Sequence, residues 1–209
     1  VGALLKSLDD KIELNRRTNE TLDAMAQAIF RDWFVDFGPV RRKLEGASDP
    51  VAIMGGLTPN PDLATALAAY FPDTFADDGL PEGWRESIIG REATALLGGT
   101  PSRKRADYWG GDVPWINSGE VNEFRIIRPS EFITREGFEN SATKLLPRRT
   151  TVLAITGATL GQVSLTEINT TTNQSVIGLV SSSRLTPEYC YLWVREVIDE
   201  IIARQTGGA

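Results

Sequence analysis

Nine positions in the first 33 residues form one continuous seam, which is apolar except for two asparagines at its middle. The positions step by three and four in strict alternation over four heptads, a pattern typical of a helix that pairs with another helix. Asparagine at two central positions would fix the register and the choice of partner. We therefore predict a partner-helix interface made of Leu5, Leu8, Ile12, Asn15, Asn19, Leu22, Ala26, Ile29 and Trp33.

The helix that carries this seam is predicted over residues 3–36, within a first part that comprises residues 1–38. The sequence Phe37-Gly38-Pro39 ends it, because glycine permits a turn and proline cannot continue a helix. Four aromatic residues crowd its last turns: Phe30, Trp33, Phe34 and Phe37. They indicate either a second docking partner or packing against the residues that follow in the same chain.

Residues 39–79 have a different character, since they are rich in Gly, Pro, Ala and Asp. They begin with a basic triplet, Arg41, Arg42 and Lys43, which is either a solvated surface or a phosphate contact. A short helix is predicted over residues 63–70, with Asp62 as its N-cap. We predict that the whole segment is a linker with little core of its own.

Residues 80–209 show the pattern of a mixed globular domain. Short β-branched runs bounded by Gly, Pro or Asn predict strands at residues 88–89, 113–116, 124–127, 151–155, 161–165 and 175–180. A C-terminal helix is predicted from Thr186 to about Arg204, with Thr186 as its cap and Pro187 at the first helical position. A short helix is predicted at residues 134–139. The predicted fold class is α+β: a long N-terminal coiled-coil helix, then a mixed α/β domain with short strands and a C-terminal helix.

The composition excludes several kinds of catalytic and metal site. The chain has no histidine and one cysteine, Cys190, so it cannot form a Ser–His triad, an intrachain disulfide or a structural zinc site. Cys190 lies in an apolar run, and we expect it to be buried. Neither metal-ligand spacing nor a nucleophile beside a base is visible, which predicts no catalytic role. No membrane span or secretory signal is visible either, so we expect a cytoplasmic protein.

Charge is unevenly distributed along the chain, whose net charge is −6. Residues 1–79 carry 8 Lys+Arg and 13 Asp+Glu, a net of −5, whereas residues 80–209 carry 14 and 15, a net of −1. Phosphate contacts supply most of the affinity of proteins for nucleic acid. An acidic chain would therefore bind DNA only through local basic loops, helped by a partner that adds positive charge.

One such loop is formed by residues 97–105. Its paired glycines, Gly98 and Gly99, would let the backbone turn tightly and approach a ligand closely. Ser102 and three consecutive cations, Arg103, Lys104 and Arg105, follow, and these side chains can grip phosphate or, for arginine, read guanine. The alternative interpretation of this loop is an ordinary solvated surface.

A second candidate region joins residues 155–161 to residues 170–175. Thr156, Thr172, Asn173 and Gln174 lie there, and amide side chains can pair bidentately with adenine while threonine reaches bases or phosphate. The alternative is a pair of hairpin turns whose polar groups satisfy their own backbone.

Several long segments resemble the specificity subunit of type I restriction-modification enzymes. Residues 8–17, 19–22, 26–30 and 33–37 are similar to its central conserved region. Residues 80–84, 98–102, 108–116, 157–161 and 173–174 are similar to its target recognition domain. The resemblance covers nearly the whole chain outside the predicted linker, so the three predicted parts are a conserved helix (1–38), a linker (39–79) and a target recognition domain (80–209).

The resemblance implies a function and partners. A full specificity subunit has two target recognition domains, each of which reads one half of a split DNA site, and two long antiparallel helices that set their spacing. Modification subunits, which bind S-adenosylmethionine and methylate adenine, dock on this scaffold, and restriction subunits join to cleave DNA. The specificity subunit itself has no catalytic role and needs no cofactor. These implications agree with the absence of a catalytic constellation in the sequence.

This chain holds one conserved helix and one recognition domain, and Val1 stands where an initiator Met would be. We therefore expect either a portion of a longer subunit or a half-size subunit that works as a dimer. In both cases the partner helix comes from outside these 209 residues, and an isolated copy should self-associate or be poorly soluble.

The predicted DNA-binding residues are chosen by residue type and loop position: Ser102, Arg103, Lys104, Arg105, Asn117, Ser118, Thr156, Thr172, Asn173 and Gln174. The alternative function is a coiled-coil scaffold whose globular domain binds protein rather than DNA, and the acidic net charge is its main support.

Overall fold

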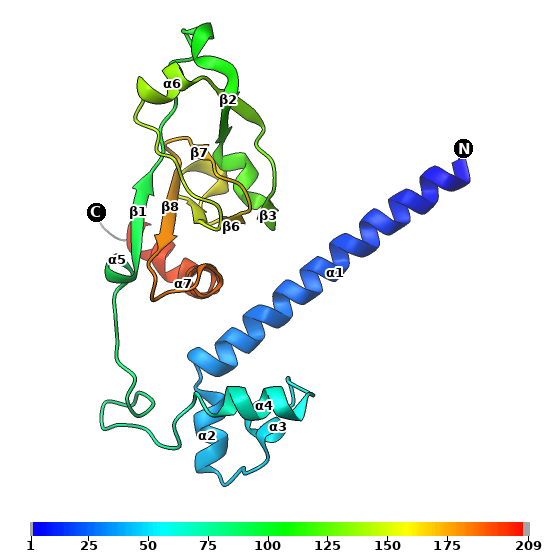
Figure 1. Ribbon diagram of the computed structural model, residues 1–209, viewed down its shortest axis with the longest axis vertical. Coiled ribbons are helices and arrows are strands. Elements are labelled where there is room, and N and C mark those ends of the chain that lie inside the picture. The colour runs from blue at the N-terminus through cyan, green and yellow to red at the C-terminus, as the bar shows by residue number, and fades with distance from the viewer. Residues whose placement is uncertain (1, 207–209) are drawn as a thin grey trace. The chain divides into compact units, whose positions relative to one another are not determined.

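The computed structural model describes residues 2–206, which fall into two compact units, Val1–Glu86 and Ser87–Ala209 (Figure 1). The first unit consists of helices and the second contains two β-sheets. The predicted α+β class, with a long N-terminal helix and a C-terminal helix, is confirmed. None of the helices within residues 2–206 has an apolar stretch long enough to cross a membrane.

The first unit begins with α1 (Gly2–Phe34), an uninterrupted helix of 33 residues (Figure 1). Gly2 is the only glycine in α1, and α1 contains no proline, so nothing in its interior breaks the hydrogen-bond ladder. Ion pairs at i,i+4 spacing support its exposed face, for example Lys6–Asp10 at 3.0 Å and Arg17–Glu13 at 2.7 Å. The helix ends two residues before the predicted end.

The prediction of a linker with little core over residues 39–79 is wrong. Three helices occupy this segment: α2 (Gly38–Leu44), α3 (Pro50–Ile53) and α4 (Pro61–Ala68). Buried side chains of these helices and of the residues just after α3 and α4 form a small core of Val40, Ile53, Met54, Ala64, Ala68 and Phe71. Many of these side chains are small, and the helices are only 4 to 8 residues long, which is why the segment has the composition of a linker.

The aromatic end of α1 completes this core. The ring of Phe34 stacks on that of Trp84 at 6.1 Å between centroids, and Trp33 meets Phe71 edge-on at 5.9 Å. Of the two interpretations that the sequence left open, the structure thus shows packing against the chain's own following residues.

The turn between α1 and α2 is closed by a charged contact. Phe37, not Gly38, adopts the left-handed conformation, with φ of 53°. Gly38 instead leaves room for the Asp32 carboxylate, because a Cβ there would lie 2.2 Å from one of its oxygens and the side chain would have to shift. That carboxylate accepts two hydrogen bonds from Arg42, at 3.0 and 2.7 Å, and Arg42 also donates to the carbonyl of Ile53 at 2.7 Å.

The other cations of the basic triplet also bind within the unit. Lys43 donates to the carbonyl of Phe71 at 2.5 Å, and Arg41 donates to that of Asp36 at 2.8 Å.

The N-cap of α4 is Asn60 rather than the predicted Asp62, since its side chain accepts hydrogen bonds from the first-turn amides at 3.0 and 3.1 Å.

The second unit contains a five-stranded sheet of order β1-β8-β5-β6-β3 and a three-stranded sheet of order β4-β2-β7. The strands are β1 (Ala93–Leu97), β2 (Trp109–Ile116), β3 (Arg125–Ile126), β4 (Glu131–Ile133), β5 (Thr151–Ala154), β6 (Val163–Thr166), β7 (Thr171–Thr172) and β8 (Val176–Ser181). Pairing is antiparallel except between β3 and β6 and between β2 and β7.

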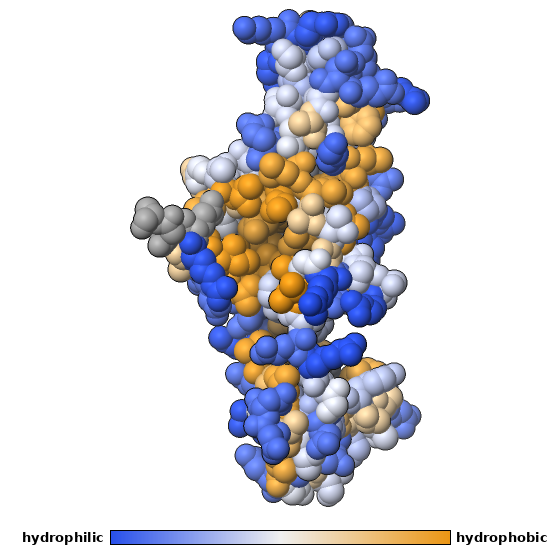
Figure 2. All heavy atoms as spheres, turned by 90° about the vertical axis from the view of Figure 1, so that its left-hand side faces the viewer, coloured by the Kyte–Doolittle hydropathy of each residue, from blue (hydrophilic) through white to orange (hydrophobic). Residues whose placement is uncertain are grey.

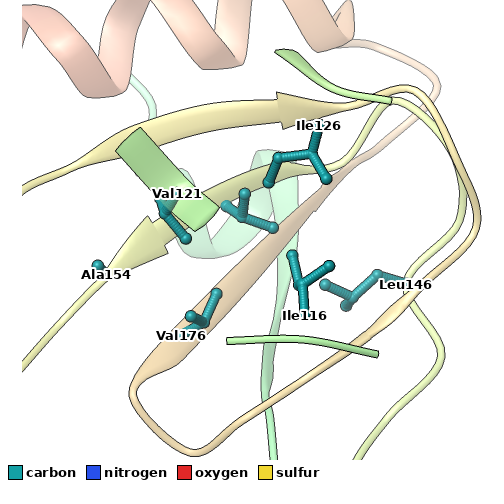
Figure 3. Close-up of a cluster of buried hydrophobic side chains, with 7 residues drawn as sticks. Ile116, Val121, Ile126, Leu146, Ala154 and Val176 are labelled. Carbon is teal, nitrogen blue, oxygen red and sulfur yellow. The ribbon is translucent and has the colours of Figure 1, made fainter. Parts of the chain in front are cut away.

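One buried cluster joins the two sheets (Figure 3). It consists of Ile116, Val121, Ile126, Leu146, Val152, Ala154 and Val176, which come from both sheets and from the segments between the strands. A second cluster lies under α7 (Pro187–Thr206), where Cys190 and Val194 pack on Leu153 of β5. Val176 of the first cluster is the first residue of β8 and directly follows the loop that carries Asn173 and Gln174.

Most of the longer predicted elements of this unit are present. The first turn of α7 is capped as predicted, because the Thr186 hydroxyl accepts a hydrogen bond from the amide of Tyr189 at 3.2 Å. The predicted strand at residues 88–89 is wrong, since Ile89 begins the short helix α5 (Ile89–Glu92). The sequence analysis missed β1, β4 and β7 and the short 3-10 helices η1 (Ala106–Tyr108), η2 (Ser118–Asn122) and η3 (Gly157–Thr159).

Candidate nucleic-acid interface

Two loops far apart in the sequence meet on the second unit. The amide of Gly98 donates to the carbonyl of Val176 at 3.1 Å, and that of Gly99 to the carbonyl of Thr172 at 2.7 Å. The Thr100 hydroxyl donates to the side-chain carbonyl of Gln174 at 2.6 Å. The basic loop of residues 97–105 and the predicted loop that carries Thr172, Asn173 and Gln174 therefore lie side by side.

The paired glycines serve this contact rather than the approach of a ligand, which corrects the expectation from the sequence. A Cβ on Gly98 would lie 2.1 Å from the carbonyl oxygen of Asn173 and 2.1 Å from the Thr172 hydroxyl. A Cβ on Gly99 would lie 2.6 Å from the amide of Thr143. Glycine is needed at Gly98 because the two loop backbones are in contact, and at Gly99 because its backbone lies against that of residues 142–143.

The three cations of the basic loop differ in their surroundings. Arg103 donates both terminal nitrogens to Glu131 of β4, at 2.5 and 2.8 Å, and its guanidinium lies 3.5 Å from the centre of the Trp109 ring. Lys104 is exposed and makes no hydrogen bond or ion pair with the residues that the structure describes. Only one of the three cations is therefore free of a carboxylate partner.

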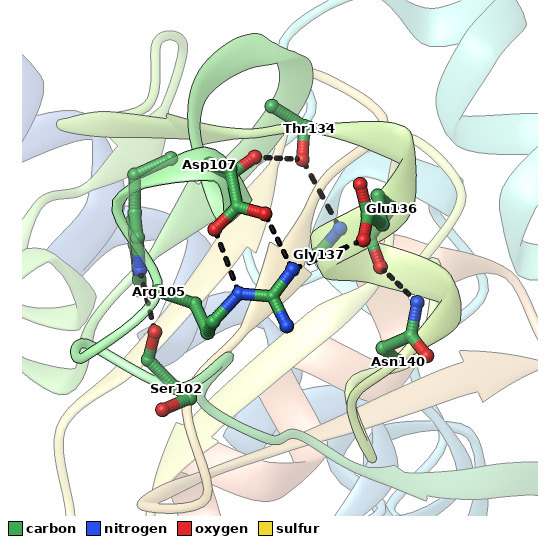
Figure 4. A network of polar contacts seen from close by, with 8 residues as sticks. Ser102, Arg105, Asp107, Thr134, Glu136, Gly137 and Asn140 are labelled. Carbon is green, nitrogen blue, oxygen red and sulfur yellow. Dashed lines mark hydrogen bonds and ion pairs between the residues drawn. The ribbon is translucent and has the colours of Figure 1, made fainter.

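Arg105 contacts two carboxylates (Figure 4). Its Nε and one terminal nitrogen donate to Asp107 at 2.9 and 2.5 Å, and the same terminal nitrogen lies 3.3 Å from Glu136. The guanidinium lowers the pKa of the Asp107 carboxyl, chiefly through these hydrogen bonds. In the same way Arg103 lowers the pKa of Glu131.

Two tryptophans donate hydrogen bonds to the backbone of the basic loop. The indole of Trp109 donates to the carbonyl of Ser102 at 3.3 Å, and that of Trp115 to the carbonyl of Gly99 at 3.2 Å. The two rings meet edge-on at 5.2 Å. The sequence analysis missed these tryptophans as site residues, although both lie in the segment 108–116 that carries the family resemblance.

Several of the residues predicted to bind DNA make contacts within the unit. Thr172 is fully buried and cannot touch DNA in this conformation, so its prediction is wrong. Asn117 caps η2, because its side-chain oxygen accepts a hydrogen bond from the backbone amide of Gly119 at 2.7 Å. The backbone amide of Asn117 donates to the carboxylate of Glu120 at 2.9 Å. Asn173 accepts from the amide of Ser175 at 3.1 Å. Ser118 is half-buried in η2.

The side chains of Ser102, Gln174 and Thr156 are exposed. Thr156 precedes η3, and the amide of the neighbouring Ile155 donates to the carbonyl of Ser175 at 2.9 Å. The loop of residues 156–161 therefore begins beside the loop of residues 173–175. Ser102, Gln174 and Thr156 thus lie on three chain segments. The segment of Gln174 is hydrogen-bonded through its backbone to each of the other two.

The predicted seam on α1 is exposed over most of its length. Leu8, Ile12 and Leu22 are 49%, 66% and 57% exposed, and Leu5, Asn15 and Asn19 are exposed as well. Ala26 and Ile29 are partly covered, and Trp33 packs in the core of the first unit. The fully exposed part of the seam therefore ends near Leu22, and Trp33 also packs against the first unit's own core.

Within the described residues no group of three or more His, Cys, Asp or Glu side chains could hold a metal ion. Cys190 is fully buried, as expected, and burial raises the pKa of its thiol.

Comparison with known proteins places the chain among sequence-specificity subunits. It is 29% identical over 226 residues to the type I restriction enzyme HindI specificity subunit of Haemophilus influenzae, a match that covers 92% of this chain and 49% of that protein. It is 28% identical over 134 residues to the MjaIX specificity subunit of Methanocaldococcus jannaschii, which covers 62% and 31%. The chain thus spans about half the length, or less, of these relatives.

Among solved structures, the HsdS subunit of Thermoanaerobacter tengcongensis matches 95% of this chain and 40% of its own, with a TM-score of 0.48 and 14% identity. Residues 81–208 match the model of the type I restriction modification DNA specificity domain. That match covers more than half of the chain, which therefore belongs to the family of type I restriction-modification specificity subunits.

Proposed function

We propose that this chain reads one half of a bipartite DNA sequence for a type I restriction-modification assembly. The observation that carries the proposal is the meeting of the loops 98–105 and 172–176 on one unit of a family defined by DNA specificity. Exposed Lys104 and Gln174 lie in these two loops. Lysine suits a phosphate, whereas the glutamine amide suits the edge of adenine.

The proposal also includes the partners that the family resemblance implies. Modification subunits that bind S-adenosylmethionine would dock on the chain and methylate the DNA that it selects, and restriction subunits would join them. The exposed seam from Leu5 to Leu22 would pair with a second helix.

The DNA-reading role is tested by selection of bound sequences from randomised duplex DNA, with the full chain assembled with a modification subunit. We expect one recovered half-site for this chain. Lys104→Ala should weaken binding to all sequences alike and lower the salt slope by about one. Gln174→Ala should instead relax the preference at one position by about 1–3 kcal/mol.

Lys11→Ala is the matched control for the lost charge, because Lys11 is exposed on α1 and makes no ion pair among the described residues. Binding without enrichment of any sequence by the wild-type complex would refute the proposed function.

The seam is tested by Ile12→Lys, with Leu14→Lys as the control. Both side chains are exposed on α1, at 66% and 63%, but only Ile12 lies on the seam. Ile12→Lys should abolish pairing with the second helix, measured as complex mass in solution, and Leu14→Lys should leave it intact. Equal effects of the two substitutions would contradict the assignment of the seam.

A protein-binding scaffold is the second candidate function. Figure 2 shows apolar side chains gathered on one face of the second unit. Separately, Ile88 before α5 and Leu97 at the end of β1 are 63% and 52% exposed. Monomeric proteins rarely expose large apolar patches, and such patches mark interaction sites. The DNA selection discriminates between the two, since a scaffold alone would recover no half-site.

A further inference from the structure

The arginines on either side of Lys104 hold their carboxylate partners in different ways. Arg103 faces Glu131 end-on, with both terminal nitrogens donating at 2.5 and 2.8 Å. Arg105 faces Asp107 side-on, through Nε at 2.9 Å and one terminal nitrogen at 2.5 Å. The two side chains are about equally exposed, at 52% and 50%, so it is geometry and not exposure that separates them.

End-on pairing occupies the end of the guanidinium that would otherwise meet a ligand. The terminal nitrogens of arginine form the fork that reads guanine or grips phosphate. In Arg103 that fork is bound to β4, and its flat face is stacked on Trp109 at 3.5 Å. Arg103 therefore fastens the basic loop to the three-stranded sheet and has no free fork for DNA.

Side-on pairing leaves a terminal nitrogen available. The Arg105 nitrogen that does not touch Asp107 makes no hydrogen bond or ion pair with any residue within 2–206 (Figure 4). The other terminal nitrogen lies 3.3 Å from Glu136, a longer and weaker contact. Asp107 and Glu136 thus hold one side of the guanidinium, and its flat face lies 4.6 Å from the centre of the Tyr108 ring. The remaining terminal nitrogen stays accessible.

The residue whose carboxylate holds Arg105 is itself held in the fold through its backbone (Figure 4). Asp107 lies in η1, and its carbonyl accepts a hydrogen bond from the Thr134 hydroxyl at 2.9 Å. The amide of Thr134 donates to the carbonyl of Tyr108 at 2.9 Å. Gly137 of α6 (Arg135–Glu139) packs so closely on this turn that a Cβ there would lie 2.6 Å from the same carbonyl.

We propose that Arg105 is the guanine-reading side chain of this loop and that Asp107 is its positioning residue. The inference rests on the proposed function and divides the work of the loop: Arg105 reads a base, Lys104 contacts phosphate, and Arg103 anchors the loop. A guanidinium already oriented by a fixed carboxylate loses less conformational entropy when it binds. A bidentate contact with guanine would use the free terminal nitrogen together with the one that now makes the 3.3 Å contact with Glu136, so guanine would replace Glu136 on binding. A guanidinium kept in place by Asp107 would retain more of the discrimination that this contact provides.

The test is selection from randomised duplex DNA by the wild-type full chain and by four variants, with affinity for a duplex of unrelated sequence measured alongside. Arg105→Lys keeps the charge but loses the fork. It should therefore bind the unrelated duplex as the wild type does, while the preference for one guanine falls by about 5- to 150-fold.

Asp107→Asn should weaken the same guanine preference by about 3- to 10-fold, because Arg105 is still present but is no longer held. Its affinity for the unrelated duplex should stay equal or rise, since a negative charge is removed. A purely structural or electrostatic role of Asp107 would not produce this loss of preference without loss of affinity.

Two variants serve as controls. Asp112→Asn removes the same charge from an exposed residue of β2 that forms no ion pair with the described residues. Glu131→Gln releases Arg103 from its anchor. Neither should change which base is preferred, although Glu131→Gln should lower the stability of the second unit.

The possible outcomes separate the two levels of the proposal. If the wild-type chain enriches a half-site and both Arg105→Lys and Asp107→Asn recover it with unchanged preference, the present inference is overturned and the proposed function stands. If the wild type enriches no sequence, the proposed function fails, and the present inference fails with it. If Asp107→Asn does not fold, Arg105→Lys alone decides, because it leaves η1 untouched.

Discussion

Replacement of Gly98 by alanine tests the contact on which the candidate interface is built. The added Cβ would lie 2.1 Å from the Asn173 carbonyl oxygen, 2.1 Å from the Thr172 hydroxyl and 2.5 Å from the Thr172 carbonyl oxygen. Two of these atoms belong to the backbone, so no side-chain rotation can make room. The two loops must move apart, although the backbone angles at Gly98 lie outside the left-handed region and are themselves open to alanine.

The cost has two parts. Extra volume in a closely packed site costs about 1–3 kcal/mol. Separation of the loops also weakens the hydrogen bonds from Gly98 to Val176 and from Gly99 to Thr172, at 3.1 and 2.7 Å, each of which contributes about 0.5–1.5 kcal/mol. We expect a loss of about 2–4 kcal/mol in the free energy of unfolding of the second unit.

Urea unfolding of the full chain measures this loss, with Gly90→Ala as the matched control. Gly90 lies in α5, has no positive φ, and a Cβ there would meet no atom within 4 Å. It should be neutral or stabilising by up to about 1 kcal/mol. A Gly98→Ala variant as stable as Gly90→Ala would refute the close approach of the two loops.

Three further predictions follow from single contacts. Arg42→Ala should destabilise the first unit by about 1–3 kcal/mol in thermal unfolding, because it leaves the Asp32 carboxylate, 29% exposed, without its bidentate partner. Cys190 should resist a thiol reagent at pH 8 until the chain unfolds, because the thiol is fully buried and its pKa is raised; rapid labelling of the native chain would contradict the packing of α7. The contribution of the Glu131–Arg103 pair to stability should be complete above the ordinary pKa of glutamate. It should disappear as the pH falls through the lowered pKa of Glu131. An NMR titration should show that the pKa of Glu131 rises in Arg103→Ala.

The sequence predicts those elements whose pattern is local and repeated. The heptad steps of α1 and the cap Thr186 before α7 both place their helices within a few residues of the observed ends. The edge strand β1 was missed because its exposed alanine and threonine residues do not alternate in hydrophobicity. The cluster of α2–α4 was missed because part of its core comes from aromatic residues outside the segment 39–79, such as Trp33 and Trp84.

The candidate site is predictable only in part for a similar reason. Residue type identifies Arg103, Lys104 and Arg105 as cations in a loop, but it cannot say which of them carries a partner. Glu131 lies 28 residues beyond Arg103, and only the pairing of β2 with β4 brings it close. Thr172 looked like a polar loop residue, yet its parallel pairing beside β2 buries it completely.

The ion pair of Asp32 with Arg42 and the packing of Trp33 and Phe34 join the C-terminal end of α1 to α2–α4. Each residue of an α-helix turns the chain by about 100° and advances it by about 1.5 Å. Insertion of a single residue between Leu22 and Phe30 would therefore rotate the whole seam by about a quarter of a turn relative to α2–α4. The length of this stretch, rather than its side chains, sets the direction in which the seam of α1 faces a second helix.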